Sequence, residues 1–166
     1  IIGLGFRKKI DNHRCWMYFP ENNNPFYRIT NFSNYSFNNV INGDTEKYYS
    51  LMCEISYSDY KPINKSSILE DTIQGLINTG MIEEDDTKYI ISEYLLDVEY
   101  TYPVPTLSRD KALIPIQEFL ESKGVFSRGR FGGWKYEVGN MDHSTMQGVE
   151  VVERILLNKT ENIYRT

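Results

Sequence analysis

The most informative stretch of this sequence is residues 125–157, VFSRGRFGGWKYEVGNMDHSTMQGVEVVERILL. Residues 125–127 predict a short strand, which runs into a glycine-rich, aromatic loop that ends at Asn140. Residues 144–147 match a capping box at the start of a helix. Four apolar residues then recur at helical spacing: Met146, Val149, Val152 and Leu156. A loop of this kind, followed by the free N–H groups of a helix N-terminus, suits an anionic cofactor group, although an ordinary strand–loop–helix connection is the alternative.

The composition excludes several classes of protein. The chain has 166 residues, of which 40% are hydrophobic and 14% aromatic, so it can build a core of about one domain or slightly more. The net charge is −5 and there is no basic block, so we expect no nucleic-acid partner. No apolar run approaches the roughly 18 residues of a membrane span, and there is no signal peptide.

The two cysteines and two histidines limit the chemistry. Cys15 and Cys53 lie in apolar, strand-like contexts, where buried free thiols are expected and a disulfide is the alternative. Free thiols indicate a reducing, cytoplasmic location. With only His13 and His143 to add, no metal site is expected. The sequence contains no Ser–His–Asp spacing and no Walker loop.

The N-terminal half predicts an antiparallel sheet. Residues 1–7 begin like a dinucleotide fingerprint, but Lys8 occupies the third glycine position, so we predict a strand with a hairpin to the next one. Further strands are predicted at 14–20, 26–33 and 47–57. Because the chain begins at Ile1 inside an apolar strand, we expect a fragment of a longer protein.

Most of the elements predicted after residue 65 are helices. An amphipathic helix is predicted at 66–80, and residues 88–100 are read as a strand, with a helix as the alternative. A helix at 109–123 begins after Ser108 and contains Pro115. The polar tail from Asn158 onward is expected to fray.

The stretch 125–157 resembles the C-terminal flavin-contacting segment of the flavin-dependent amine oxidase superfamily, which includes protoporphyrinogen oxidase-like proteins and UDP-galactopyranose mutase. The resembling segments are Gly129-Arg130-Phe131-Gly132, Trp134-Lys135-Tyr136, Asn140-Met141-Asp142 and Gln147-Gly148-Val149-Glu150. The similarity extends upstream through Tyr102-Pro103-Val104-Pro105 and residues 109–113.

This resemblance implies an α+β fold. Residues 1–124 would form an antiparallel sheet of the substrate-domain type with two or three packed helices. Residues 125–166 would supply the C-terminal strand, glycine-rich loop and helix of the FAD-binding domain. FAD is expected in the full-length parent and not in this fragment, because the N-terminal dinucleotide-binding half is missing.

Three functions remain open at this point. The first is the C-terminal portion of an FAD-dependent oxidoreductase of the amine oxidase or protoporphyrinogen oxidase type, inactive alone. The second is a fragment of a UDP-galactopyranose mutase-like enzyme of cell-surface polysaccharide synthesis. The third is a standalone, non-catalytic binding domain. Expected partners are a small-molecule substrate, possibly a nucleotide sugar, the missing half of the parent, and other copies of the fragment through an exposed apolar surface.

The resemblance also implies a set of cofactor-binding residues: Gly129, Arg130, Gly132, Gly133, Asn140, Met141 and Asp142. The glycines would let the loop approach a flat ring, or would serve turn geometry alone. Arg130 would meet a phosphate or an electron-rich carbonyl, or form a surface ion pair. Asp142 is expected to point away from an anionic flavin.

Three residues are expected to bind substrate: Trp134, Tyr136 and Arg28. Aromatic packing is the alternative for the first two, and the three residues Glu137-Val138-Gly139 make this loop longer than in the mutases. Arg28 lies among strand aromatics, where an arginine often meets an anion. No catalytic residue is assigned, and His143 is either a proton relay or a polar surface residue.

Overall fold

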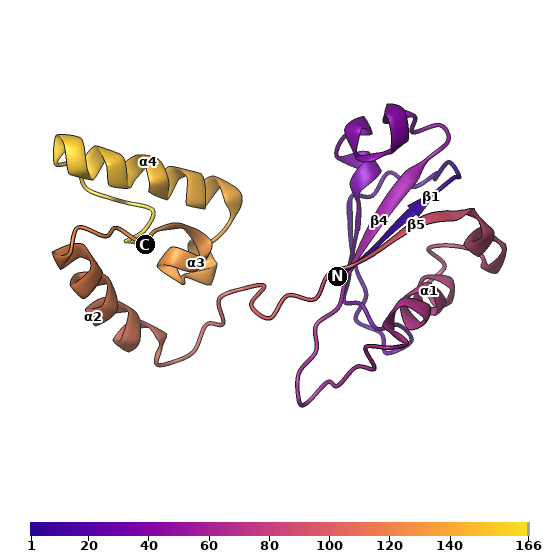
Figure 1. Ribbon diagram of the computed structural model, residues 1–166, viewed down its shortest axis with the longest axis horizontal. Helices are drawn as coiled ribbons and strands as arrows, with labels where there is room; N and C mark the ends of the chain where they lie inside the picture. Colours follow the sequence, from indigo (N-terminus) through magenta and orange to yellow (C-terminus); the bar gives the residue numbers. More distant parts are fainter. Residues whose placement is uncertain (166) are drawn as a thin grey trace. The chain divides into compact units, whose positions relative to one another are not determined.

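The computed structural model describes residues 1–165, which divide into two compact units. Unit 1 is Ile1–Val98, and unit 2 begins at Glu99 (Figure 1). The helix predicted at 109–123 therefore folds with the C-terminal unit. The division at residue 124 concerns the domains of a longer parent and stays a prediction.

Unit 1 is a five-stranded sheet with one α-helix and four short 3-10 helices. The strands are β1 (Ile2–Phe6), β2 (Trp16–Tyr18), β3 (Arg28–Asn31), β4 (Tyr49–Glu54) and β5 (Ile90–Leu95). The helices are η1 (Phe32–Asn34), η2 (Phe37–Asn39), η3 (Ile41–Gly43), α1 (Ile68–Asn78) and η4 (Glu84–Tyr89). The predicted antiparallel sheet is confirmed, and β5 confirms the strand predicted within 88–100.

The strand order is β2-β3-β4-β1-β5, and every neighbouring pair is antiparallel. The predicted hairpin between the first two strands is wrong, because β1 lies between β4 and β5 instead. Gly3 and Gly5 of β1 lie opposite Tyr94 and Ser92 of β5. A Cβ at Gly5 would collide with the Ser92 hydroxyl, whereas a Cβ at Gly3 would lie at an ordinary contact distance from Tyr94. Gly5 therefore leaves room for the Ser92 side chain.

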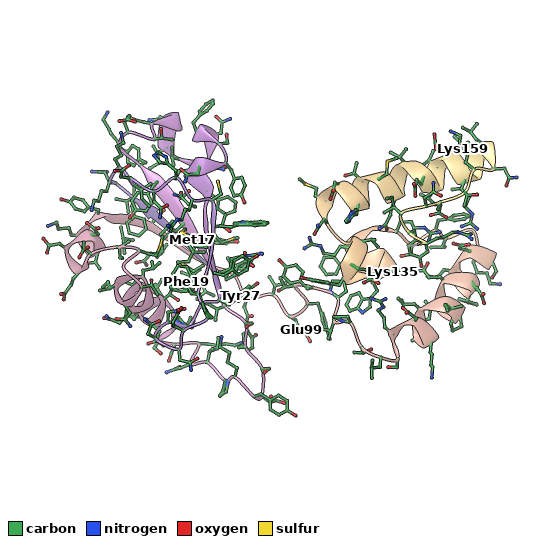
Figure 2. The ribbon with its side chains drawn as sticks, turned by 180° about the vertical axis from the view of Figure 1, so that it is seen from behind. Met17, Phe19, Tyr27, Glu99, Lys135 and Lys159 are labelled. Carbon is green, nitrogen blue, oxygen red and sulfur yellow. The ribbon has the colours of Figure 1, made fainter. Side chains whose placement is uncertain are left out.

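The core of unit 1 lies between the sheet and α1. Alternate residues of β1 are buried, as expected for a strand with one covered face. Met17 and Phe19 point toward this core from β2 and the residue after it (Figure 2). The buried side chains of the core are Ile2, Leu4, Phe6, Met17, Phe26, Ile29, Tyr49, Leu51, Cys53, Ile68, Leu76 and Ile82.

Helix α1 confirms the helix predicted at 66–80. Thr79 is its C-cap residue, and Gly80 follows with a φ of 68°, which is the left-handed conformation that glycine tolerates best. Cys15 and Cys53 are free thiols, and burial raises the pKa of Cys53 to about 12. That thiol is inert at neutral pH.

Unit 2 contains α2 (Arg109–Ser122), α3 (Gly129–Gly133), η5 (Tyr136–Val138) and α4 (Met141–Leu157). Helix α2 runs continuously through Pro115. Its C-terminus forms a Schellman motif: Gly124 donates to the Glu121 carbonyl and Val125 to the Leu120 carbonyl, both at 2.9 Å.

Three expectations for unit 2 are wrong. Residues 125–127 form no strand, since the described chain offers them no neighbouring strand to pair with. The glycine-rich loop contains the short helix α3. The capping box at 144–147 is also absent, because α4 begins earlier, after Asn140, and Ser144 already donates its backbone N–H to the Asn140 carbonyl.

Helix α4 is amphipathic in the reverse sense to the one expected. Its apolar stripe is exposed: Met146 46%, Val149 47%, Val152 51% and Leu156 73%. Gln147 and Glu150 are the residues that it buries. The tail does not fray within the described residues, since Glu161 is 1% exposed. The last residue, Thr166, lies outside the description.

None of the helices within residues 1–165 is both long and apolar enough to cross a membrane.

Candidate functional site

A cluster of aromatic side chains surrounds Arg28 on unit 1. The Arg28 guanidinium lies 4.9 Å from the Trp16 ring and 5.9 Å from the Tyr18 ring, measured to the ring centroids. These rings are 54% and 64% exposed. Since β2 and β3 are paired through Tyr18 and Arg28, the sheet register itself brings these side chains together. We call Trp16, Tyr18, Tyr27, Arg28 and Glu54 the Arg28 cluster.

The charge of Arg28 is matched by a buried carboxylate. Its Nε and Nη2 atoms donate to the two oxygens of Glu54 at 2.8 and 2.6 Å. Tyr27 donates its hydroxyl to the same carboxylate at 2.7 Å. Glu54 is 5% exposed and lies opposite Arg28 in the β3–β4 register. The bidentate pair fixes the plane of the guanidinium.

In unit 2, the loop between α3 and α4 is held by Gln147. Its side-chain oxygen accepts the Gly129 N–H at 2.8 Å, and its side-chain nitrogen donates to the Val138 carbonyl at 2.8 Å. Gln147 is 1% exposed. One buried amide therefore ties both ends of the segment 129–139, which we call the glycine loop. The sequence pattern did not single out Gln147 as its organiser.

Arg130 lies in the glycine loop with its guanidinium plane over Tyr102. The Cζ atom is 5.0 Å from the ring centroid, and Nε donates to the Gly139 carbonyl at 2.7 Å. Within residues 1–165, no carboxylate forms an ion pair with Arg130. The surface ion pair considered as an alternative is thus absent from the described chain.

The glycines of the loop are required by packing inside unit 2. A Cβ at Gly132 would lie 2.8 Å from the Ser127 hydroxyl, and one at Gly133 would lie 3.3 Å from the Tyr164 ring. Gly129 has a φ of 84°, which a residue with a side chain adopts only with strain. Their contact with a flat ring stays a prediction, because these packing contacts account for them without one.

The N-terminus of α4 has no side-chain cap. Asn140 occupies the N-cap position, and its side chain accepts no hydrogen bond from the first turn. Met141 is 84% exposed and Asp142 is also exposed. The Nδ1 atom of His143 is buried without a hydrogen-bond partner among the described residues. The positive end of a long helix is therefore open to a negatively charged group.

The two aromatic residues predicted to bind substrate lie in different surroundings. Trp134 adopts a left-handed conformation with a φ of 52° at the end of α3, and its ring is 6.2 Å from that of Phe131. Tyr136 is 55% exposed and meets Tyr102 edge to face at 6.0 Å. Tyr136, Tyr102 and Arg130 thus form one aromatic and cationic group, which Trp134 does not join through any of these contacts.

Glu137 anchors the glycine loop to α2. Its two oxygens accept hydrogen bonds from Nη1 and Nη2 of Arg109, both at 2.7 Å. These bonds lower the pKa of Glu137 to about 2, so the carboxylate is charged at neutral pH. The pair was not found in the sequence, because the two residues belong to separate predicted elements.

No group of three or more His, Cys, Asp or Glu side chains in the described chain is arranged to hold a metal ion.

No protein-family model matches this chain. Among solved structures, the chain is similar to one described as a crystal structure of reduced UDP-galactopyranose mutase, with a TM-score of 0.86 and 43% sequence identity. The match covers 98% of this chain and 34% of that chain. This chain is therefore similar, over nearly its whole length, to about a third of a UDP-galactopyranose mutase.

Proposed function

We propose that this chain is part of a flavoprotein similar to UDP-galactopyranose mutase, which acts on a nucleotide sugar and uses FAD without net oxidation. The observation that carries the proposal is the match over 98% of the chain at 43% identity. Since the chain spans 34% of that structure's length, the activity is proposed for a longer protein.

The open end of α4 supports a role in holding the flavin. A reduced flavin carries negative charge at its pyrimidine edge, and the uncapped N–H groups at Asn140, Met141 and Asp142 favour such charge. The unpartnered Nδ1 atom of His143 adds a polar atom beside them. A bound FAD would supply the redox-active ring, and these residues would orient it.

Arginine and aromatic side chains in each unit, taken separately, support recognition of a nucleotide sugar. Arg130 has no ion pair within residues 1–165, so its charge is not cancelled by a carboxylate of the described chain. Arg28 is held in one plane by Glu54, between exposed aromatic rings that could stack on a base or a sugar. Tyr102 and Tyr136 supply the same kind of surface beside Arg130.

The exposed apolar faces of unit 2 support a longer parent. Helix α2 exposes Ile116 and Phe119, and α4 exposes Val149 and Leu156. In a complete protein these faces would be covered by chain outside this sequence. In the isolated chain they would promote self-association, and the isolated chain would bind FAD weakly.

The similarity to a mutase favours this function over the amine oxidase-type oxidation considered from the sequence. A standalone binding domain would share the fold but would turn over no substrate.

The test is turnover of UDP-galactopyranose by the full-length protein that carries this sequence. We expect a yellow, flavin-containing protein that converts the sugar nucleotide under reducing conditions. Absence of turnover in flavin-loaded, reduced protein would overturn the proposal.

A matched pair of variants tests the arginine in the glycine loop. Arg130→Ala should lower kcat/KM about 10- to 100-fold, because a charge-assisted contact to phosphate is lost. Lys111→Ala removes a cation from an exposed position on α2 and should leave kcat/KM unchanged.

A further inference from the structure

The C-terminal tail returns along the helix that precedes it. Asn158 adopts a φ of 54° after α4, and the chain reverses there (Figure 1). Glu150 of α4 accepts the backbone N–H groups of Asn162 and Ile163, each at 2.9 Å. Because Glu150 is 6% exposed, a buried carboxylate determines the course of the tail.

Glu161 connects the tail to the rest of unit 2 through a network of ion pairs. Its carboxylate accepts hydrogen bonds from Nε and Nη2 of Arg128 and, at 2.8 Å, from Nη1 of Arg154. Glu121 of α2 binds the same two arginines, at 2.6 and 2.7 Å. The Glu161 side chain has no exposed surface and Arg128 has 5%.

Tyr164 makes the second set of contacts from the tail. Its ring lies 4.0 Å from the Arg128 guanidinium, and its backbone carbonyl accepts a hydrogen bond from Lys135 Nζ at 2.7 Å. Gly133 packs under the same ring, where a Cβ would make a tight contact of 3.3 Å. Lys135 lies in unit 2 beside α3, whereas Lys159 lies at the C-terminal end of α4 and forms an ion pair with Glu153 (Figure 2).

These contacts meet at the glycine loop. Arg128 immediately precedes α3, and Lys135 follows it by two residues. The tail therefore contacts residues before and after α3 in the chain, Arg128 and Lys135. We propose that residues 158–165 are a clamp that positions the glycine loop and Arg130 toward the ligand, with Glu161 and Tyr164 as positioning residues. The consequence for the ligand rests on the proposed function.

The buried ion pairs of Glu161 are suited to holding the glycine loop in a fixed position. Burying a carboxylate is costly unless it is paired and hydrogen-bonded, and an apolar side chain would fill the same space more cheaply. What the ion network adds is direction, because bidentate arginine contacts fix both distance and plane. A displacement of about 1 Å in a ligand-binding loop can cost up to about 100-fold in rate.

The test uses Glu161→Gln in the full-length protein, with Glu118→Gln as its control. Glu118 is exposed on α2 and makes no contact with the clamp through the ion pairs of the described residues. We expect Glu161→Gln to speed backbone hydrogen exchange across residues 129–139 and to raise the KM for UDP-galactopyranose about tenfold, with a smaller change in kcat. The control should change neither quantity.

Tyr164 provides a second variant in case Glu161→Gln does not fold. Tyr164→Ala removes the ring from Arg128 and should reproduce the effects of Glu161→Gln. Tyr164→Phe retains the ring and the carbonyl, so it should restore wild-type exchange and KM.

The outcomes separate the clamp from the proposed function. Unchanged exchange at residues 129–139 in both disruptive variants overturns the clamp. Faster exchange with an unchanged KM in an active enzyme overturns the positioning role. If the wild-type protein turns over no UDP-galactopyranose, the proposed function fails, and hydrogen exchange alone still decides whether the tail holds the loop.

Discussion

Unit 1 buries apolar side chains, whereas unit 2 buries mainly polar and charged ones. The connected core of unit 1 runs from the sheet to α1 and includes Phe6, Leu51 and Leu76. In the described part of unit 2 the buried polar residues are Gln117, Gln147, Glu150 and Glu161, while Val138 is the one large apolar residue with a buried side chain. The two units of one chain are thus stabilised by different physical forces.

Helices α1 and α4 show how this difference affects the prediction of a buried helix face. Helix α1 buries Ile68 and Leu76 from its apolar stripe. Helix α4 has an equally regular stripe but turns it outward, and it buries Gln147 and Glu150. Hydrophobic periodicity therefore locates a helix reliably, but it predicts the buried face only where the helix covers its own core.

The largest expected loss of stability comes from disrupting the charge network of unit 2. Glu161→Ala leaves the buried Arg128 and the partly exposed Arg154 with Glu121 as the remaining carboxylate of the network, and should cost about 3 to 5 kcal/mol of stability in unit 2. Trp134 reports on unit 2 in a Trp16→Phe background, because the chain has one tryptophan in each unit. Denaturant unfolding followed by Trp134 fluorescence measures the change, and Glu118→Ala, at an exposed position of α2, is the control. A loss below about 1 kcal/mol would show that the network does not stabilise the unit.

The corresponding change in unit 1 is Leu76→Ala. The side chain is 0% exposed, so the cavity should cost about 3 kcal/mol, and protection of β4 against hydrogen exchange should fall while that of α4 is unchanged. Leu107→Ala is the matched control, since Leu107 is fully exposed. Equal loss of protection in both units would mean that they unfold as one.

Lowering the pH should destabilise unit 2 more than unit 1, and we expect this difference to be smaller than the effects of the two substitutions above. Hydrogen bonds from Arg154 and then Arg128 lower the pKa of Glu121 to about 2, and Arg128 lowers the pKa of Glu161. Carboxylates with a lowered pKa stabilise the folded state above their ordinary value of 4.5, and this stability is lost as the pH falls toward 2.

In the described part of unit 1, lysine partners lower the pKa of two carboxylates: Lys8 lowers that of Asp86, and Lys65 lowers that of the more exposed Asp97. These two pairs are separate, whereas Glu121 and Glu161 of unit 2 share the same two arginines. We therefore expect Trp134 fluorescence to report unfolding at a higher pH than Trp16 fluorescence does. Coincident acid transitions would remove the distinction between the units.

The smallest expected effect is that of Arg109→Lys. The bidentate bonds to Glu137 would become one, but the Glu137 side chain is 47% exposed and solvent screens the pair. We expect less than about 1 kcal/mol of lost stability in unit 2, measured by the same Trp134 transition. A loss above about 2 kcal/mol would show that this exposed pair is coupled to the buried network.

Much of the fold was predictable because its elements carry local patterns. The alternation in β1 and β4, the stop at Gly80 and the Schellman end at Gly124 all act within a few residues. The pairing of β1 with β4 and β5 was not predictable, since it depends on contacts between distant segments. Gly3 and Gly5 of β1 were considered only as part of a dinucleotide-binding fingerprint, which was rejected, and not as a sign of this strand pairing.

The sequence predicted where the candidate site lies, but it did not predict which residues hold the site in place. The glycine loop and the start of α4 at Asn140 were both predicted, whereas Gln147, Glu137 and the tail were not recognised as their supports. A glutamine between apolar helix residues has no distinguishing local pattern. Its role follows from two backbone groups that lie nine and eighteen residues away along the chain.

The amino-acid sequence alone determined where the strands of unit 1 and helices α1, α2 and α4 lie and where the glycine loop meets α4, because these depend on local backbone preferences and periodicity. Only the tertiary structure decided which face of α4 is buried, that the polar tail is an anchor and that Arg128 rather than Arg130 is paired. Burial and ion pairing depend on which distant groups replace water around a side chain, and local sequence does not specify those groups.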